Sequence, residues 1–148
     1  MVLPAVPDSA VSLGAQASDW RAAVALAGAA LARSGATTSN YADEMIRMID
    51  EHGPYIVIAP GLALAHARSG PEVLRDGLAV VTLATPVPFG HPHNDPVSVV
   101  LALAVHAPER HLLLVAELAN VFNDSDAIAR LAAATSADEV RTILGVAA

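Results

Sequence analysis

The sequence contains neither cysteine nor lysine. The absence of cysteine excludes disulfides, thiolate nucleophiles and cysteine-ligated zinc sites. The absence of lysine excludes Schiff-base chemistry and the phosphate-binding lysine of Walker-type loops. The six histidines are therefore the main candidates for chemistry near neutral pH.

Positive charge and aromatic side chains are scarce as well. The net charge is −7, and the eight basic residues are all arginines spread along the chain. A nucleic-acid-binding protein needs a concentrated basic surface to displace phosphate counterions, so we expect no nucleic-acid partner. Aromatic residues make up only 3% of the chain, which predicts a core of alanine, valine, leucine and isoleucine.

Long hydrophobic segments are also missing. The longest apolar runs, Ala22–Ala32 and Val99–Ala107, are shorter than the ~18–20 residues that a membrane-spanning helix needs. The segment Met1–Ser9 lacks the basic start of a signal peptide, so we expect a cytoplasmic protein. The length of 148 residues and the apolar fraction of 54% predict one folded domain, residues 1–148.

Helix signals stand on both sides of a strand-like middle segment. One helix is predicted from the Ser18-Asp19 cap to near Gly35, and a second from Thr37–Asn40 to Gly53-Pro54. The strand-like runs are Tyr55–Ile58, Leu62–Leu64, Leu78–Leu83 and Val97–Val105. Signals for three further helices are Pro108–Phe122, an Asp124 cap and the capping box Ser136–Glu139. This order predicts an α/β (α+β) sandwich, in which helices cover a small mixed β-sheet.

Three of the histidines differ in the role that their surroundings predict. We expect His52 and His106 to be structural, because His52 ends a predicted helix and His106 follows a strand in a loop. His66 follows small and apolar residues, and Arg68 lies two positions later. A neutral imidazole can attack phosphorus, and a transferred phosphoryl group needs positive partners. The alternative for His66 is a hydrogen-bonded core histidine.

His111 lies near the start of the helix that begins at Pro108. Unpaired N–H groups at such a terminus attract anions, and a histidine there adds a further donor. The alternative for His111 is an ordinary surface side chain beside the charged residues Glu109 and Arg110.

The segment Gly90–Pro96 concentrates polar residues. His91, His93 and Asp95 form a His-x-His-x-Asp pattern that is similar to the first ligand motif of metallo-β-lactamase-like hydrolases. Pro96 stands where that motif continues with histidine, and no histidine follows position 111, so a metal site is disfavoured. The alternative is a rigid loop that is fixed by its prolines and by local hydrogen bonds.

Two segments, Gly53–Arg68 and Pro88–Val97, resemble the IIA component of the phosphoenolpyruvate-dependent sugar phosphotransferase system. The similarity is to the mannitol/fructose superfamily, above all to its ascorbate-type branch, and it extends from Ser18 to Ser136. It implies the mannitol/fructose-type IIA fold and a cytoplasmic phosphotransferase that carries a phosphoryl group without a cofactor or a metal.

The resemblance also implies partners and site residues. Phospho-HPr would be the donor, a cysteine of a IIB component the acceptor, and the membrane IIC component an indirect partner. The phosphorylated residue falls on His66, and a second histidine of the site falls on His111. Because this chain has no cysteine, we expect it to be neither a IIB component nor a IIA–IIB fusion.

Four further residues are expected around the phosphoryl group. Arg68 would supply positive charge, whereas His91, Asn94 and Asp95 match a motif that lines the same region in the ascorbate-like branch. The chain departs from the family at Ala65, where proline is usual, and this change loosens the turn before the phosphorylated histidine.

The sequence leaves several alternatives open. A nitrogen-type regulatory IIA module would share the phosphorylated histidine, and a histidine-based metallohydrolase is a less favoured reading of the loop. The sequence does not specify the transported sugar, for which ascorbate and a pentitol are candidates. It also does not specify whether the chain forms a homodimer.

Overall fold

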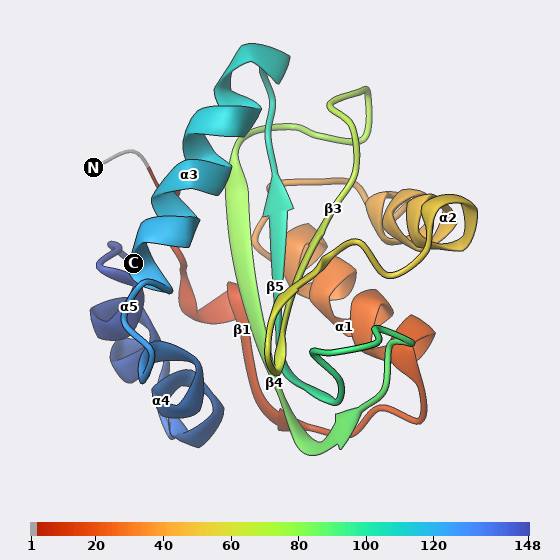
Figure 1. Ribbon diagram of the computed structural model, residues 1–148. Coiled ribbons are helices and arrows are strands. Elements are labelled where there is room, and N and C mark those ends of the chain that lie inside the picture. The colour runs from red at the N-terminus through yellow and green to blue at the C-terminus, as the bar shows by residue number, and fades with distance from the viewer. Residues whose placement is uncertain (1–2) are drawn as a thin grey trace.

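The computed structural model describes residues 3–148. One mixed sheet of five strands lies in the middle, in the order β1-β4-β5-β3-β2. Helices α1 and α2 cover one face, and α3, α4 and α5 cover the other (Figure 1). The prediction of a small mixed sheet covered by helices is therefore confirmed. The strands are β1 (Val11–Ala15), β2 (Val57–Ala59), β3 (Leu62–His66), β4 (Gly77–Val87) and β5 (Val97–Ala104).

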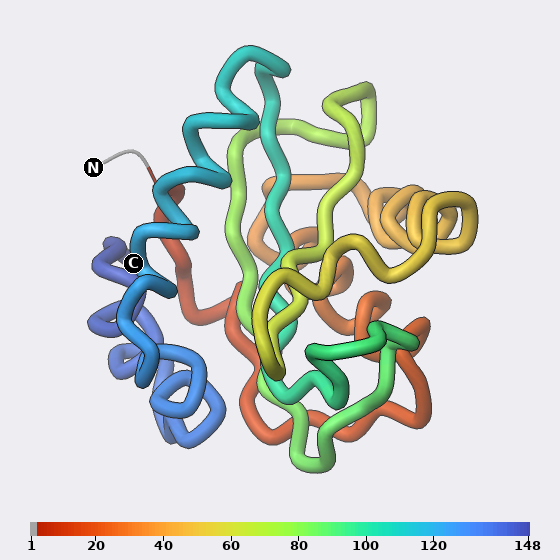
Figure 2. The backbone as a smooth tube through the Cα atoms, in the orientation of Figure 1, coloured from red at the N-terminus to blue at the C-terminus, as the bar shows by residue number. Residues whose placement is uncertain are grey.

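The helices follow the predicted order. They are α1 (Trp20–Arg33), α2 (Tyr41–His52), α3 (His111–Val121), α4 (Ala127–Ala133) and α5 (Ala137–Leu144), with short 3-10 turns at Asp8–Ala10 and Pro108–Arg110. The Asp19 carboxylate caps α1 by accepting from the Ala22 N–H, and the Ser136 hydroxyl caps α5 by accepting from the Glu139 N–H. The backbone tube follows the chain from β1 through α1 and α2, then through β2 to β5, and finally through α3 to α5 (Figure 2).

The central strands are buried on both faces. All of β5 is buried except the partly exposed Ser98, and β4 is buried from Gly77 to Leu83. Continuous apolar runs of this kind are expected where helices cover both faces of a sheet. β3 pairs parallel with β5, and β4 pairs antiparallel with β5. The core therefore lies in the two layers between the sheet and its helices.

Three elements of the structure differ from the prediction. β1 was not predicted, because its five residues form an edge strand with a bulge near Gly14 and no clean alternation of burial. The run Tyr55–Ile58 contributes only the short β2, since its first residues lie in a turn. The cap of α4 is at Asp126, because Asp124 instead accepts from the Asp126 N–H and pairs with Arg130.

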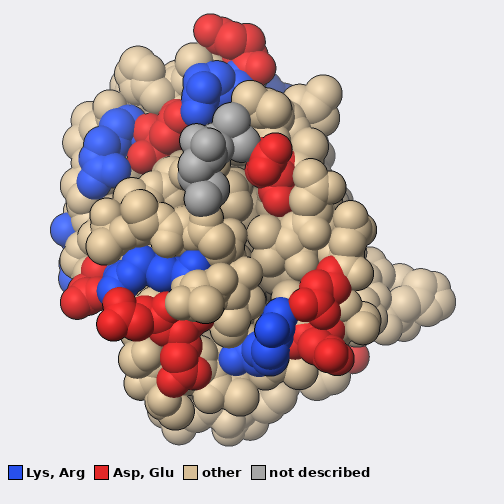
Figure 3. Space-filling model, turned by 90° about the vertical axis from the view of Figure 1, so that its left-hand side faces the viewer, with Lys and Arg blue, Asp and Glu red and all other residues tan. Residues whose placement is uncertain are grey.

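The face formed by α3, α4 and α5 mixes charges of both signs (Figure 3). Arg130 lies 2.6 Å from the Asp124 carboxylate, and Arg141 contacts both Asp8 and Asp138. The exposed pair of Arg130 with Asp124 contributes little stability, whereas the side chain of Arg141 is mostly buried beside its two acidic partners. Within residues 3–148, every helix is too short or too polar to cross a bilayer.

Helices α1 and α2 cross closely where a glycine allows it. A Cβ atom at Gly28 would lie 2.4 Å from the Cβ of Ala42 and 2.8 Å from its Cα. Contact with a backbone atom cannot be relieved by turning a side chain, so the two helices would have to separate. The missing side chain of Gly28 therefore sets the spacing of this layer.

We expect Gly28→Ala to lower the free energy of unfolding by about 1–3 kcal/mol, the usual cost of overpacking a core. This loss occurs although alanine favours helix by about 1 kcal/mol over glycine. Urea denaturation measures it, with Ala29→Ser on the exposed face of the same helix as a control that changes little. An unfolding free energy equal to or above that of the unsubstituted protein would contradict the close crossing.

Candidate functional site

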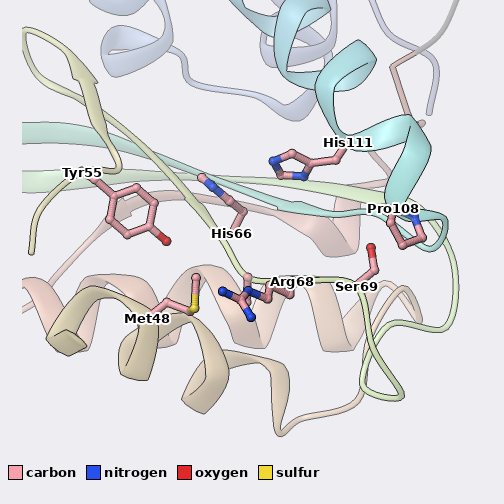
Figure 4. A pocket seen from close by; sticks show the side chains of 8 residues that line it. Met48, Tyr55, His66, Arg68, Ser69, Pro108 and His111 are labelled. Carbon is pink, nitrogen blue, oxygen red and sulfur yellow. The ribbon is translucent and has the colours of Figure 1, made fainter. Parts of the chain in front are cut away.

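A pocket of about 500 Å³ opens where β3 ends, between α2 and the start of α3 (Figure 4). Its walls come from segments that are distant in sequence. The lining residues are Met48, Tyr55, His66, Ala67, Arg68, Ser69, Pro108 and His111.

The topology brings His66 and His111 together. β3 and β5 are parallel, and His66 is paired in register with Leu103, so both strands end at the same edge of the sheet. After β5 the chain turns through Pro108–Arg110, and α3 begins at His111. The centroids of the two imidazole rings lie 5.2 Å apart, with an angle of 50° between the rings.

A hydrogen bond selects the tautomer of His66. The ring Nδ1 lies 2.9 Å from the carbonyl oxygen of Leu64. Because a carbonyl oxygen only accepts, Nδ1 carries the hydrogen, and in the neutral ring the lone pair lies on Nε2. His66 can therefore act as a nucleophile through Nε2.

The carbonyl of Leu64 is available because β2 is short. The N–H of Leu64 donates to the carbonyl of Ile56, so this residue directs its backbone groups toward the β2 edge. β2 begins only at Val57, one residue later. The imidazole of His66 therefore takes the carbonyl that a longer β2 would pair.

Burial lowers the pKa of His66 below its ordinary value, and the nearby His111 lowers it further, whereas the hydrogen bond to Leu64 acts in the opposite direction. The lowered pKa keeps the ring neutral at pH 7. A neutral ring has the Nε2 lone pair that attack on phosphorus requires.

Tyr55 supplies part of this burial. Its ring meets that of His66 edge to face, with centroids 5.6 Å apart, and its own side chain is 40% exposed. Tyr55 therefore stands between the His66 ring and solvent on one side of the pocket, while His111 stands on another (Figure 4).

We expect Tyr55→Ala to raise the pKa of His66 toward the ordinary histidine value, because water would reach the ring and favour its charged form. The acid limb of any reaction that uses the neutral ring would then move to higher pH. An NMR titration of the ring measures the shift, with Ile58→Ala as a control, since Ile58 is 46% exposed and does not line the pocket. An unchanged or lowered pKa would show that Tyr55 does not shield His66.

Arg68 places a cation at the pocket. Its side chain is exposed, and it lines both this pocket and a neighbouring groove beside α2. The ion pairs formed among residues 3–148 do not include Arg68. Its guanidinium is therefore free to meet an anionic group beside His66.

The structure does not place His91, Asn94 and Asp95 at this pocket, which corrects the prediction that they surround the phosphoryl group. The carbonyl of Asn94 accepts from the N–H of Gly61, just before β3 begins. His66 is the last residue of β3, and the strand from Leu62 to His66 is about 13 Å long at 3.3 Å per residue. Spacing along the sequence could not show at which end of the strand the loop returns.

The loop instead holds its own backbone. The Asp95 carboxylate accepts from the N–H groups of Phe89, Gly90 and His91. Nδ1 of His91 accepts from the N–H groups of His93 and Asn94. These contacts agree with the rigid-loop alternative. In residues 3–148, no three histidine or acidic side chains lie close enough together to hold a metal ion.

The other two histidines lie where the sequence suggested. His52 is the last residue of α2, and His106 is exposed after β5. Sequence reasoning missed Met48, Tyr55, Ser69 and Pro108 as pocket residues. The Gly53-Pro54 helix stop was a usable signal for Tyr55, because it ends α2 directly before this residue.

A sequence profile decides the family. The profile described as "Phosphoenolpyruvate-dependent sugar phosphotransferase system, EIIA 2" matches residues 6–145. The chain belongs to this EIIA family. An ascorbate-specific PTS system EIIA component from Shigella flexneri is 32% identical over 138 residues, which cover 93% of this chain and 90% of the relative.

Solved structures of IIA proteins have the same fold. The IIA mannitol protein of Escherichia coli is 26% identical with a TM-score of 0.82, covering 93% of this chain and 97% of its own. The same value, 0.82, is found for enzyme IIAMTL in its complex with phosphorylated enzyme IIBMTL, at 25% identity and with coverage of 94% and 96%. Nitrogen regulatory protein IIA-Ntr of Neisseria meningitidis has a TM-score of 0.79 at 27% identity, with coverage of 93% and 94%.

Proposed function

We propose that this EIIA protein is a cytoplasmic phosphocarrier that accepts a phosphoryl group from phospho-HPr on Nε2 of His66. It then passes the group to a cysteine of a IIB component during sugar uptake through a IIC component. The observation that carries the proposal is the hydrogen bond from His66 Nδ1 to the Leu64 carbonyl, 2.9 Å long, which leaves the lone pair on Nε2.

The first step is an in-line displacement at phosphorus. The Nε2 lone pair of neutral His66 forms the new N–P bond, and the bond between phosphorus and phospho-HPr breaks with its electron pair going to the donor. His66 keeps its Nδ1 hydrogen, so the phosphorylated ring carries positive charge, and the Leu64 carbonyl stabilises that charge by accepting the hydrogen bond. In the second step a cysteine thiolate of IIB attacks the same phosphorus and Nε2 recovers its lone pair.

Three features favour the negative phosphoryl oxygens at this place. His111 lies beside the His66 ring, the exposed Arg68 lines the same pocket, and α3 begins at His111 with its N–H groups. These hydrogen-bond donors and positive charges are in place before the donor protein docks. Metal coordination is not needed for the step, because both reacting side chains come from proteins.

The surface beside the pocket suits a protein partner. Leu112 is 78% exposed and Leu113 is 45% exposed, and both directly follow His111. These two leucines and the half-exposed Tyr55, whose ring contacts that of His66, are referred to as the apolar border. Exposed apolar side chains next to a reactive group support docking of another protein. The complex of IIAMTL with phosphorylated IIBMTL supports IIB as one such partner.

The relatives favour transport over regulation. The ascorbate-specific component, a sugar-system protein by its name, is 32% identical over 93% of this chain, which supports a transport role. The regulatory alternative shares the phosphorylated histidine, so phosphorylation alone does not separate the two roles. Onward transfer to a IIB cysteine does.

Incubation with phosphoenolpyruvate, enzyme I and HPr tests the proposal. We expect one acid-labile phosphoryl group per chain, and none when HPr is omitted. The labelled protein is then mixed with a IIB component of an ascorbate-type system and with its Cys→Ser variant. We expect label on the cysteine-containing IIB alone, and an EIIA protein that remains unlabelled in the first step contradicts the proposal.

A further inference from the structure

Tyr41 joins the two strand ends that meet beside the pocket. Its hydroxyl accepts from the N–H of Ala67 at 2.9 Å and donates to the carbonyl of Leu103 at 2.9 Å. Leu103 is the register partner of His66, so the hydroxyl lies where the β3–β5 ladder stops. One phenol therefore connects the backbone that directly follows His66 to β5.

The hydroxyl takes the place of a further ladder bond. A regular ladder joins N–H and C=O groups of neighbouring strands directly, whereas here Tyr41 lies between the Ala67 N–H and the Leu103 carbonyl. The two strand ends are thereby held apart by one oxygen atom. Ala67 stands between His66 and Arg68, so its peptide group governs the direction of both side chains.

The environment makes this contact obligatory. Tyr41 is 1% exposed, Leu103 is fully buried and Ala67 is 7% exposed, so little water reaches the hydroxyl and its partners. Burial raises the pKa of Tyr41 to about 12, which keeps the phenol protonated and able to donate to Leu103. Both backbone groups depend on this one oxygen atom.

We propose that Tyr41 is a positioning residue for phosphoryl transfer, which sets the peptide between His66 and Arg68 and thereby the orientation of the His66 ring. This inference rests on the proposed function. Without the hydroxyl, the Ala67 N–H and the Leu103 carbonyl are either unpaired or bonded directly to each other. In both cases the backbone after His66 moves, and the bond from Nδ1 to the Leu64 carbonyl weakens.

Tyr41→Phe removes the oxygen and leaves the ring. We expect the maximal rate of labelling by phospho-HPr to fall by about tenfold to a hundredfold, because small misplacements of a reacting group have effects of this size. We expect the KM for phospho-HPr to stay within about twofold, since the exposed apolar border is untouched. The ¹⁵N shifts of the unphosphorylated His66 ring should show a mixture of tautomers instead of Nδ1–H alone.

Ile49→Val is the matched control. Ile49 is buried on the same helix, and the substitution lowers stability by about 1 kcal/mol without removing a polar group. We expect it to keep the unsubstituted rate and the unsubstituted tautomer. An equal loss of rate in both variants would show that Tyr41 acts only through stability and would overturn the inference.

Two further outcomes separate this inference from the proposed function. An unchanged His66 tautomer in Tyr41→Phe overturns the inference, whether or not the protein is labelled. Failure of the unsubstituted protein to be labelled overturns the proposed function instead. Amide exchange of the unsubstituted protein tests the contact without any variant: the Ala67 N–H should exchange far more slowly than that of exposed Arg68. Equally fast exchange of the two amides overturns the inference.

Discussion

His66→Ala should reduce labelling by phospho-HPr to background, a loss of more than about 10³-fold. The substitution removes the Nε2 lone pair that the proposed step requires. The fold should persist, because position 66 is the last residue of β3 and is only partly buried. The measurement is the stoichiometry of acid-labile phosphate after incubation with phosphoenolpyruvate, enzyme I and HPr.

The control for this variant is His52→Ala. His52 is exposed at the end of α2, outside the pocket that holds His66. It should keep one phosphoryl group per chain. A folded His66→Ala protein that is labelled to the same extent as His52→Ala would refute the assignment of the nucleophile and with it the proposed step.

His111→Ala should still be labelled, but it should pass the group to IIB more slowly by about 10²–10³-fold. Because the ring centroids lie 5.2 Å apart, we expect His111 to lie beside a phosphoryl group on His66 and to stabilise charge on its oxygens in the transition state. Single-turnover transfer from the phosphorylated protein to IIB measures the effect.

His111→Gln is the matched variant for this second prediction. Glutamine keeps an N–H donor but has no ionisable ring, so we expect a rate between those of the alanine variant and the unsubstituted protein. Transfer from His111→Ala at the unsubstituted rate would mean that His111 is only a neighbour of the reactive ring.

The fold was predictable where periodicity and caps were strong. The caps at Asp19 and Ser136, the glycine that ends α2 and the apolar runs of β4 and β5 all predicted the elements that form there. The edge strand β1 was not predicted, because an edge strand needs no continuous apolar run, and its pairing with β4 is a long-range contact.

The candidate site was predictable only in part. His66, Arg68 and His111 were named from their local sequence and from the family resemblance, and the structure places all three at one pocket. The loop residues His91, Asn94 and Asp95 were grouped with them wrongly, since the loop returns at the start of β3 and not at its end. Tyr41 and Tyr55 act on His66 through tertiary contacts, which local sequence spacing does not reveal.

NMR of the ¹⁵N-labelled protein after phosphorylation by phospho-HPr tests the central claim most directly, because it identifies both the histidine and the ring nitrogen that carry phosphorus. Our account predicts phosphorus on Nε2 of His66, with the Nδ1 hydrogen still bonded to the Leu64 carbonyl. Phosphorus on Nδ1 of His66, or on any other histidine, would contradict it.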